Sequence, residues 1–138
     1  MMTPDQCRLV RQSLEPLREM AGPFVLLFYG RLFEIDPSAR RLFHNDLTIQ
    51  GHKLMHTLDV LVDSLDDFTA VRDRLFALGQ RHQAYGVRPE QYASVVAAFL
   101  WALGQALGPD FDAPTRGAWR AVLSAVSTVM QEGASTGA

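Results

Sequence analysis

Hydrophobic residues recur along this chain with the three- and four-residue spacing of amphipathic helices. Within residues 70–84, Leu75, Leu78 and His82 share one face. The region of residues 47–64 shows the same spacing in a run of leucines: Leu47, Leu54, Leu58, Leu61 and Leu65. Alternating β-branched runs and Asn-Gly or Asp-Gly hairpin turns are missing. The pattern predicts an all-α protein.

Capping residues and prolines divide the first third of the chain. Thr3 is expected to cap a helix that begins with Pro4, whose missing N–H would be unbonded in the first turn anyway. Pro16 should kink or end that helix, because it removes a hydrogen-bond donor. Gly22-Pro23 starts a second helix, and its run FVLLFYGRLF, apolar on nearly every side, is predicted to lie deep in the core.

The remaining boundaries follow the same signals. Asp36-Pro37 opens a short helix that ends near Phe43, and Asp66-Asp67 marks a break before the helix of residues 70–84, which Gly86 ends. A long helix then runs from Pro89 to Gly108-Pro109. Asp112 with Pro114 starts the last helix, and the tail EGASTGA, residues 132–138, is expected to fray, as are residues 1–2.

Size and charge narrow the class of protein. The 138 residues fit one domain, with 48% hydrophobic and 20% charged residues. A net charge of −2 and the absence of a Lys/Arg cluster argue against a nucleic-acid partner. No apolar run approaches the roughly 18 residues of a membrane span, and the charged N-terminus is unlike a signal peptide, so a cytoplasmic protein is expected.

The candidates for metal chemistry are few. Cys7 is the one cysteine, so an internal disulfide or a cysteine-based cluster is excluded. His44 lies in a polar corner typical of an exposed turn. His52 and His56 are four residues apart, a spacing that can present two imidazoles to a metal, but a solvated helix face is the favoured interpretation. His82 lies on an apolar face, where a histidine is more often a satisfied core residue than a ligand.

A wider pattern gives His82 a role. The segment LGQRHQAYGVRPEQYASVVAAFLWAL resembles the proximal region of the globin family. GPFVLLFYGRLFEIDPSARRLF resembles its second and third helices, LTIQGHKLM the start of its distal helix, and AWRAVLSAVSTVM its last helix. The resemblance covers nearly the whole chain and is nearest to bacterial single-domain haemoglobins and the globin half of flavohaemoglobins, with some likeness to neuroglobin. It implies the globin fold, a 3-over-3 helical sandwich around haem b.

The resemblance also implies roles for particular residues. His82 would be the axial iron ligand, oriented by the carbonyl of Leu78, with Tyr29 and Gln50 as hydrogen-bond donors on the gas-binding side. Other residues are expected to contact the haem: Phe43, Leu54, Val87, Tyr92 and Val95. Lys53 and Arg81 could reach its propionates, but either could equally be solvated. Phe28, Phe33 and Phe99 are candidates for its apolar surroundings. Tyr92 matches the tyrosine of a flavohaemoglobin His-Tyr-Glu relay, but Glu132 lies two residues early, so a complete relay is not expected.

Several functions fit this pattern. The first is tight O₂ binding at ferrous iron together with oxidation of NO, as a nitric oxide dioxygenase that depends on a separate flavin/NAD(P)H reductase. The second is non-enzymatic oxygen transport or storage. The third is gas or redox sensing through a protein partner, and the fourth a helical bundle without a cofactor. The sequence leaves open whether the chain is a monomer or a homodimer.

Overall fold

The computed structural model describes residues 2–43 and 46–136, and every regular element within them is helical. His44 lies outside the described residues. The elements are α1 (Pro4–Glu19), α2 (Ala21–Ile35), η1 (Pro37–Leu42), α3 (Leu47–Asp63), η2 (Leu65–Asp67), α4 (Phe68–Tyr85), α5 (Pro89–Leu107), η3 (Gly108–Asp110) and α6 (Ala113–Thr136). The all-α prediction is confirmed.

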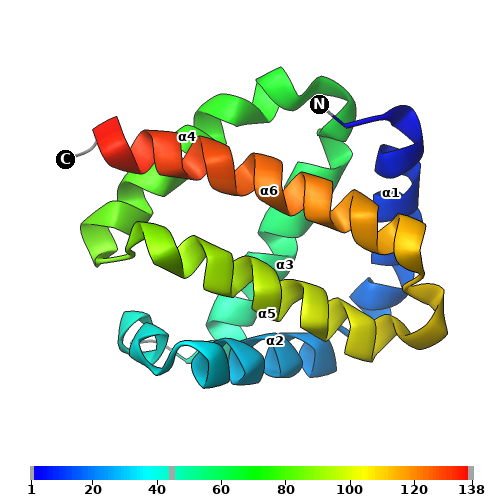
Figure 1. Ribbon diagram of the computed structural model, residues 1–138, viewed down its shortest axis with the longest axis horizontal. Helices are drawn as coiled ribbons and strands as arrows, with labels where there is room; N and C mark the ends of the chain where they lie inside the picture. Colours follow the sequence, from blue (N-terminus) through cyan, green and yellow to red (C-terminus); the bar gives the residue numbers. More distant parts are fainter. Residues whose placement is uncertain (1, 44–45, 137–138) are drawn as a thin grey trace.

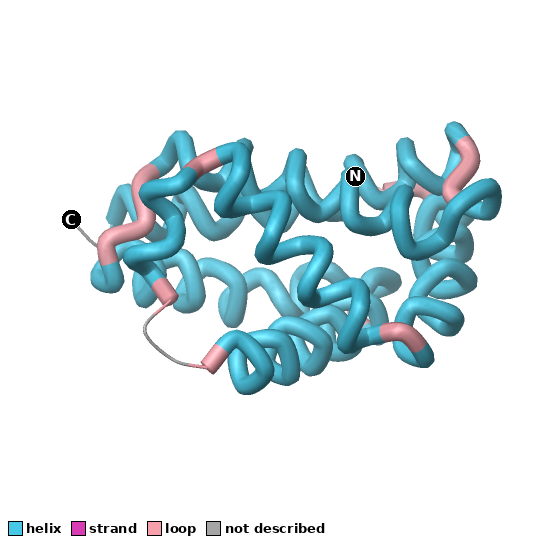
Figure 2. Tube along the Cα trace, turned by 90° about the horizontal axis from the view of Figure 1, so that it is seen from below, coloured by secondary structure: helices cyan, strands magenta, loops and turns pink. Residues whose placement is uncertain are grey.

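The helices form two layers around one core. In Figure 1, α2, α5 and α6 lie in front, while α1, α3 and α4 lie behind them. Short loops join the helices (Figure 2). The most extensive packing pairs α4 with α6 and α2 with α5, and α6 also packs against α1. The largest fully buried side chains, among them Trp119, Phe24 and Leu14, come from both layers, and Trp119 Nε1 donates a 2.7 Å hydrogen bond to Ser13 Oγ.

Most of the predicted boundaries are confirmed. Thr3 Oγ1 accepts from the N–H of Gln6, and Asp36 and Asp112 cap their helices in the same way. Gly86 ends α4 in the left-handed conformation, with φ of 101°, which a residue without a Cβ adopts at little cost. These caps fix where the corners of the fold lie.

Two expectations about the first helices need correction. Of the kink or end expected at Pro16, the end is wrong: α1 continues to Glu19, because the buried Leu14 and Leu17 hold this turn on the core while Pro16 removes a single hydrogen bond. Helix α2 is not buried all round: Leu26 is 69% exposed and Ile35 41% exposed. A helix in an outer layer keeps one face toward solvent, whatever its composition.

Two further expectations also change. The tail expected to fray remains helical as far as Thr136, because Gly133 is buried against α4. One helical stretch, Pro89–Asp110, is long and apolar enough to span a membrane by composition, contrary to the expectation. In the fold this stretch packs against α2 and α6, and its residues Ala98, Phe99 and Leu103 are buried.

Two glycines set the distance between α4 and α6. A Cβ on Gly79 would overlap the backbone carbonyl oxygen of Met130, and a Cβ on Gly133 would overlap that of Phe76. The backbones of the two helices therefore touch at both points, which other residue types would prevent. This crossing fixes α4, the helix that carries His82.

Replacing Gly79 by alanine should lower the free energy of unfolding by about 2–3 kcal/mol or more, because the backbones must separate. Gly117→Ala is the matched control, since its Cβ meets nothing within 4 Å. The control should stabilise the protein by up to about 1 kcal/mol, because alanine loses less backbone entropy in a helix. Urea unfolding measures both values, and equal stabilities for the two variants would contradict the close crossing.

Candidate functional site

The imidazole of His82 is held by its own helix. His82 Nδ1 lies 2.8 Å from the carbonyl oxygen of Leu78, one turn earlier in α4. Because a carbonyl only accepts hydrogen bonds, Nδ1 must carry the proton, and in the neutral ring Nε2 then bears the lone pair. The predicted orientation of His82 by Leu78 is present in the structure. The arrangement presents Nε2 as a donor atom for a metal.

The surroundings of His82 favour its neutral form. Burial lowers the pKa of His82 and the charge of Arg81 lowers it further, while the hydrogen bond to the carbonyl of Leu78 opposes both effects. A ring that loses its proton readily keeps its lone pair available near neutral pH. Within the described residues no group of three or more His, Cys, Asp or Glu side chains is placed to hold a metal ion. A single imidazole suits a metal that brings its other ligands with it, as haem iron does.

Tyr29 lies in an aromatic cluster that brings together α2 and the end of η1. Its ring meets Phe43 edge-on with centroids 5.1 Å apart, and Phe28 at 5.0 Å. Phe33 contacts both Tyr29 and Phe43, at 6.1 Å and 5.6 Å. Tyr29 and Phe43, predicted for the gas-binding side and for a haem contact, are thus neighbours.

The side chain of Tyr29 is buried, and its hydroxyl forms no hydrogen bond with another described residue. The residue is 4% exposed, and none of the hydrogen bonds between described residues involves its Oη atom. Burial raises the pKa of Tyr29 to about 12, so the phenol stays protonated at neutral pH. A protonated, unpartnered hydroxyl in an apolar setting is a ready donor for a polar ligand.

Helix α3 carries the other residues expected on that side. Gln50 and Leu54, one turn apart, are partly buried, and Leu54 packs against the core. Gln50 has its backbone N–H bonded to Asp46, and its side-chain amide has no hydrogen bond among the described residues. Lys53 between them is exposed. The amide of Gln50 is thus available to a ligand.

The corner after His82 adds apolar and polar surface. Val87 is partly buried, Val95 is 38% exposed, and Tyr92 is buried. Tyr92 and Val87 line a cavity of about 760 Å³ between the ends of α4 and α6 and the start of α5. The Tyr92 hydroxyl is buried and has no hydrogen-bond partner among the described residues, while burial raises the pKa of Tyr92.

The charged candidates lie at the surface. Arg81 is exposed, and neither it nor Lys53 forms an ion pair within the described residues. Glu132 pairs with Arg72, with Oε2 2.6 Å from Nη2, rather than with Tyr92. His52 and His56 are exposed on α3, as their favoured interpretation predicted.

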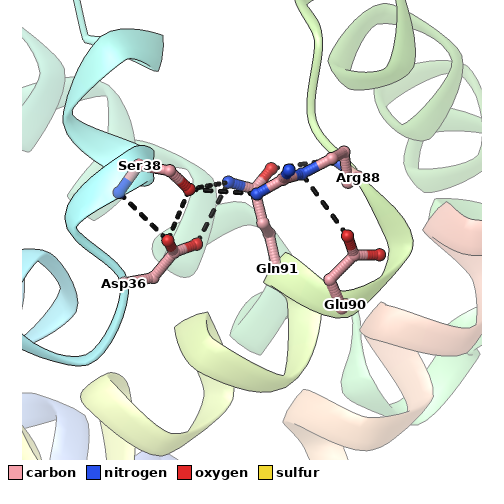
Figure 3. A network of polar contacts seen from close by, with 5 residues as sticks. All are labelled: Asp36, Ser38, Arg88, Glu90 and Gln91. Carbon is pink, nitrogen blue, oxygen red and sulfur yellow. Dashed lines mark hydrogen bonds and ion pairs between the residues drawn. The ribbon is translucent and has the colours of Figure 1, made fainter.

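A polar cluster near the site escaped sequence reasoning. Gln91 is buried, and with Asp36, Ser38, Arg88 and Glu90 it forms a network between η1 and the start of α5 (Figure 3). The signal available in the sequence was Gln91 itself, three residues after Arg88, because a glutamine at that position of a first helical turn often bonds back to the cap. Here its Oε1 accepts the Arg88 N–H at 2.8 Å.

These residues fit the haem that the resemblance implies. The chain offers one imidazole with a bound Nδ1 and an available Nε2, and an unpartnered phenol beside a phenylalanine that can contact a ring. The apolar candidates Leu54, Leu78 and Val87 are partly buried and pack against the core. Such a donor set suits a planar, apolar macrocycle whose metal needs one more ligand from the protein.

Comparisons with known proteins agree with this fit. The family model described as Globin matches residues 26–130. Neuroglobin of Chaenocephalus aceratus is 33% identical, over 91% of this chain and 87% of that protein, and neuroglobin-1 of Oncorhynchus mykiss is 33% identical, over 96% and 92%.

Solved structures give the same result. A Pseudomonas aeruginosa protein, described as structurally highly homologous to a human haemoglobin, has a TM-score of 0.82 at 30% identity and covers 93% of this chain and 97% of its own. An engineered carbene transferase from Rhodothermus marinus, provisionally described as a nitric oxide dioxygenase, has a TM-score of 0.87 at 24% identity, covering 99% and 95%. At 24% identity, the similarity to the Rhodothermus marinus protein shows the fold alone.

Proposed function

Since this chain belongs to the globin family, in which haem binds small gases, we propose that it binds haem b through His82 Nε2. We further propose that it holds O₂ tightly and oxidises NO with electrons from a separate flavin/NAD(P)H reductase. The observation that carries the proposal is the fixed, neutral imidazole of His82, whose Nδ1 is bonded to the carbonyl of Leu78. Residues 1–138 would act as a single domain.

Haem, when bound, supplies the iron at which diatomic gases bind and the electron transfer that joins O₂ and NO into nitrate. Leu78 orients the imidazole through His82 Nδ1, which keeps Nε2 directed along one line. Phe43, Leu54, Val87 and Val95 provide apolar contacts that exclude water. Tyr92 adds to the wall near His82, and Lys53 and Arg81 are placed at the surface, where cations can pair with propionates.

Tyr29 and Gln50 account for tight retention of O₂. Each offers a donor without another hydrogen-bond partner among the described residues, and a donor to a negatively polarised acceptor stabilises it by about 1–3 kcal/mol. The raised pKa of Tyr29 keeps its proton in place. Oxidation of NO to nitrate then consumes one electron, since NO, O₂ and an electron together give NO₃⁻. A cytoplasmic reductase is the proposed electron source.

A carrier or store is the second candidate, favoured by the same two donors, because slow release of O₂ serves retention without any reaction. It differs from the first candidate in the fate of NO. For the third function, gas or redox sensing through a protein partner, no contact among the described residues gives specific support.

Replacing His82 with alanine should abolish stable haem binding or leave the iron with an abnormal axial ligand. The measurement is the visible absorption spectrum of the ferric, reduced and CO-treated protein. His52→Ala is the control, because that imidazole is exposed on α3 and should leave the spectrum unchanged. A normal ferrous spectrum in the His82 variant would contradict the assignment.

Replacing Tyr29 with phenylalanine should speed O₂ dissociation by about tenfold or more, since about 1.4 kcal/mol of lost hydrogen bonding is a factor of ten. Gln50→Leu is expected to act in the same direction in the same stopped-flow assay. Tyr85→Phe is the control, because Tyr85 is 70% exposed at the end of α4. Unchanged rates in both variants would show that neither donor faces the gas.

Reaction with NO is expected to distinguish the two candidates. Ferrous protein under air, given a pulse of NO, should yield nitrate in a stoichiometric amount relative to haem, and repeated turnover should need an added flavin reductase with NAD(P)H. Ion chromatography measures the nitrate. If NO is consumed without nitrate formation while O₂ binding is normal, the carrier function replaces the dioxygenase function.

A further inference from the structure

The network in Figure 3 joins two segments that lie far apart in the sequence. Gln91 Nε2 donates to Asp36 Oδ2 at 3.1 Å and approaches Ser38 Oγ at 3.5 Å, while Arg88 Nη2 donates to Ser38 Oγ at 3.0 Å. Asp36 and Ser38 lie where η1 begins, and Arg88 and Gln91 lie where α5 begins. The contacts therefore join residues 50 to 55 positions apart in the chain.

Both segments lead directly to residues of the proposed haem site. Element η1 ends at Leu42, and Phe43 follows it in contact with Tyr29. Val87 precedes Arg88 in the corner after His82, and its N–H bonds to the carbonyl oxygen of His82 at 3.0 Å. Phe43 and Val87 would press on the haem from different elements, and the network fixes the distance between the elements that carry them.

The network is saturated around one buried amide. Gln91 is 4% exposed, and its Oε1 accepts the Arg88 N–H while its Nε2 donates to Asp36. Asp36 also accepts from the N–H and the hydroxyl of Ser38. Hydrogen bonds from Ser38 and Gln91, together with the charge of Arg88, lower the pKa of Asp36 against its partial desolvation. The carboxylate is thus kept charged, as an acceptor for Gln91.

We propose that Asp36, Ser38, Arg88 and Gln91 form a positioning clamp that holds η1 against the start of α5 and thereby slows the loss of haem. This inference rests on the proposed function, because it assumes that haem lies between Phe43 and Val87. Gln91 and Asp36 act through these neighbours, without contacting haem themselves. Opening the clamp lets the two segments separate and the cofactor leave.

The test first removes the hydrogen bond between Gln91 and Asp36, and then rebuilds it with donor and acceptor exchanged. Gln91→Glu places a second carboxylate against Asp36 and should speed haem transfer to an excess of a haem-scavenging apoglobin by about tenfold or more. Adding Asp36→Asn supplies an amide donor opposite the new carboxylate, so the double variant should recover most of the original rate. Gln105→Glu is the matched control, an exposed glutamine on the same helix, and should change nothing.

A second control separates positioning from general stability. Val10→Ala removes buried volume from α1, which carries none of the proposed haem contacts, and its urea unfolding gives a stability reference. The clamp predicts that Gln91→Glu loses haem faster than Val10→Ala at equal loss of apoprotein stability. An unchanged rate in Gln91→Glu, failure of the double variant to recover, or equal rates in the two variants would overturn the clamp. A chain that takes up no haem at all would overturn the proposed function instead.

Discussion

The close crossing of α4 and α6 is the constraint on which the site depends. Gly79 and Gly133 bring the two backbones into contact, and His82 follows Gly79 by less than one turn of the same helix. With α4 fixed against α6, the remaining freedom of the imidazole is rotation of its own side chain. The carbonyl of Leu78 removes that freedom through His82 Nδ1. Backbone packing and one hydrogen bond thus determine where Nε2 lies.

The two sides of the proposed site are built on different physical principles. His82 is held by a hydrogen bond and by a helix packed through its backbone. Tyr29 is held by packing of its ring among Phe28, Phe33 and Phe43, and its hydroxyl bonds to no other residue that the structure describes. An atom that ligates iron must stay in one place, whereas a hydrogen-bond donor to a bound gas must be available to that gas. Each residue has the surroundings that its proposed task requires.

Much of the fold follows from local signals in the sequence. Thr3, Asp36, Asp112 and Gly86 act within a few residues of their own position, so the caps and corners they predict are present. The wrong predictions concern packing between helices that are far apart in the sequence. The exposure of Leu26, the helical end of the chain near Gly133 and the continuation of α1 past Pro16 depend on which neighbouring helix covers each segment. Periodicity along one helix does not contain that information.

The candidate site shows the same division. The resemblance implied the bond from His82 to Leu78, which spans one helical turn. It implied separate roles for Tyr29 and Phe43, and the contact between their rings emerged only from the structure. Gln91 was missed because its partners, Asp36 and Ser38, lie more than 50 residues away. A buried amide is costly unless it is bonded, so such a residue marks a place where distant segments must meet in one arrangement. Here that place joins the two segments that would enclose the cofactor, and under the proposed clamp the retention of haem would depend on residues outside the haem contacts.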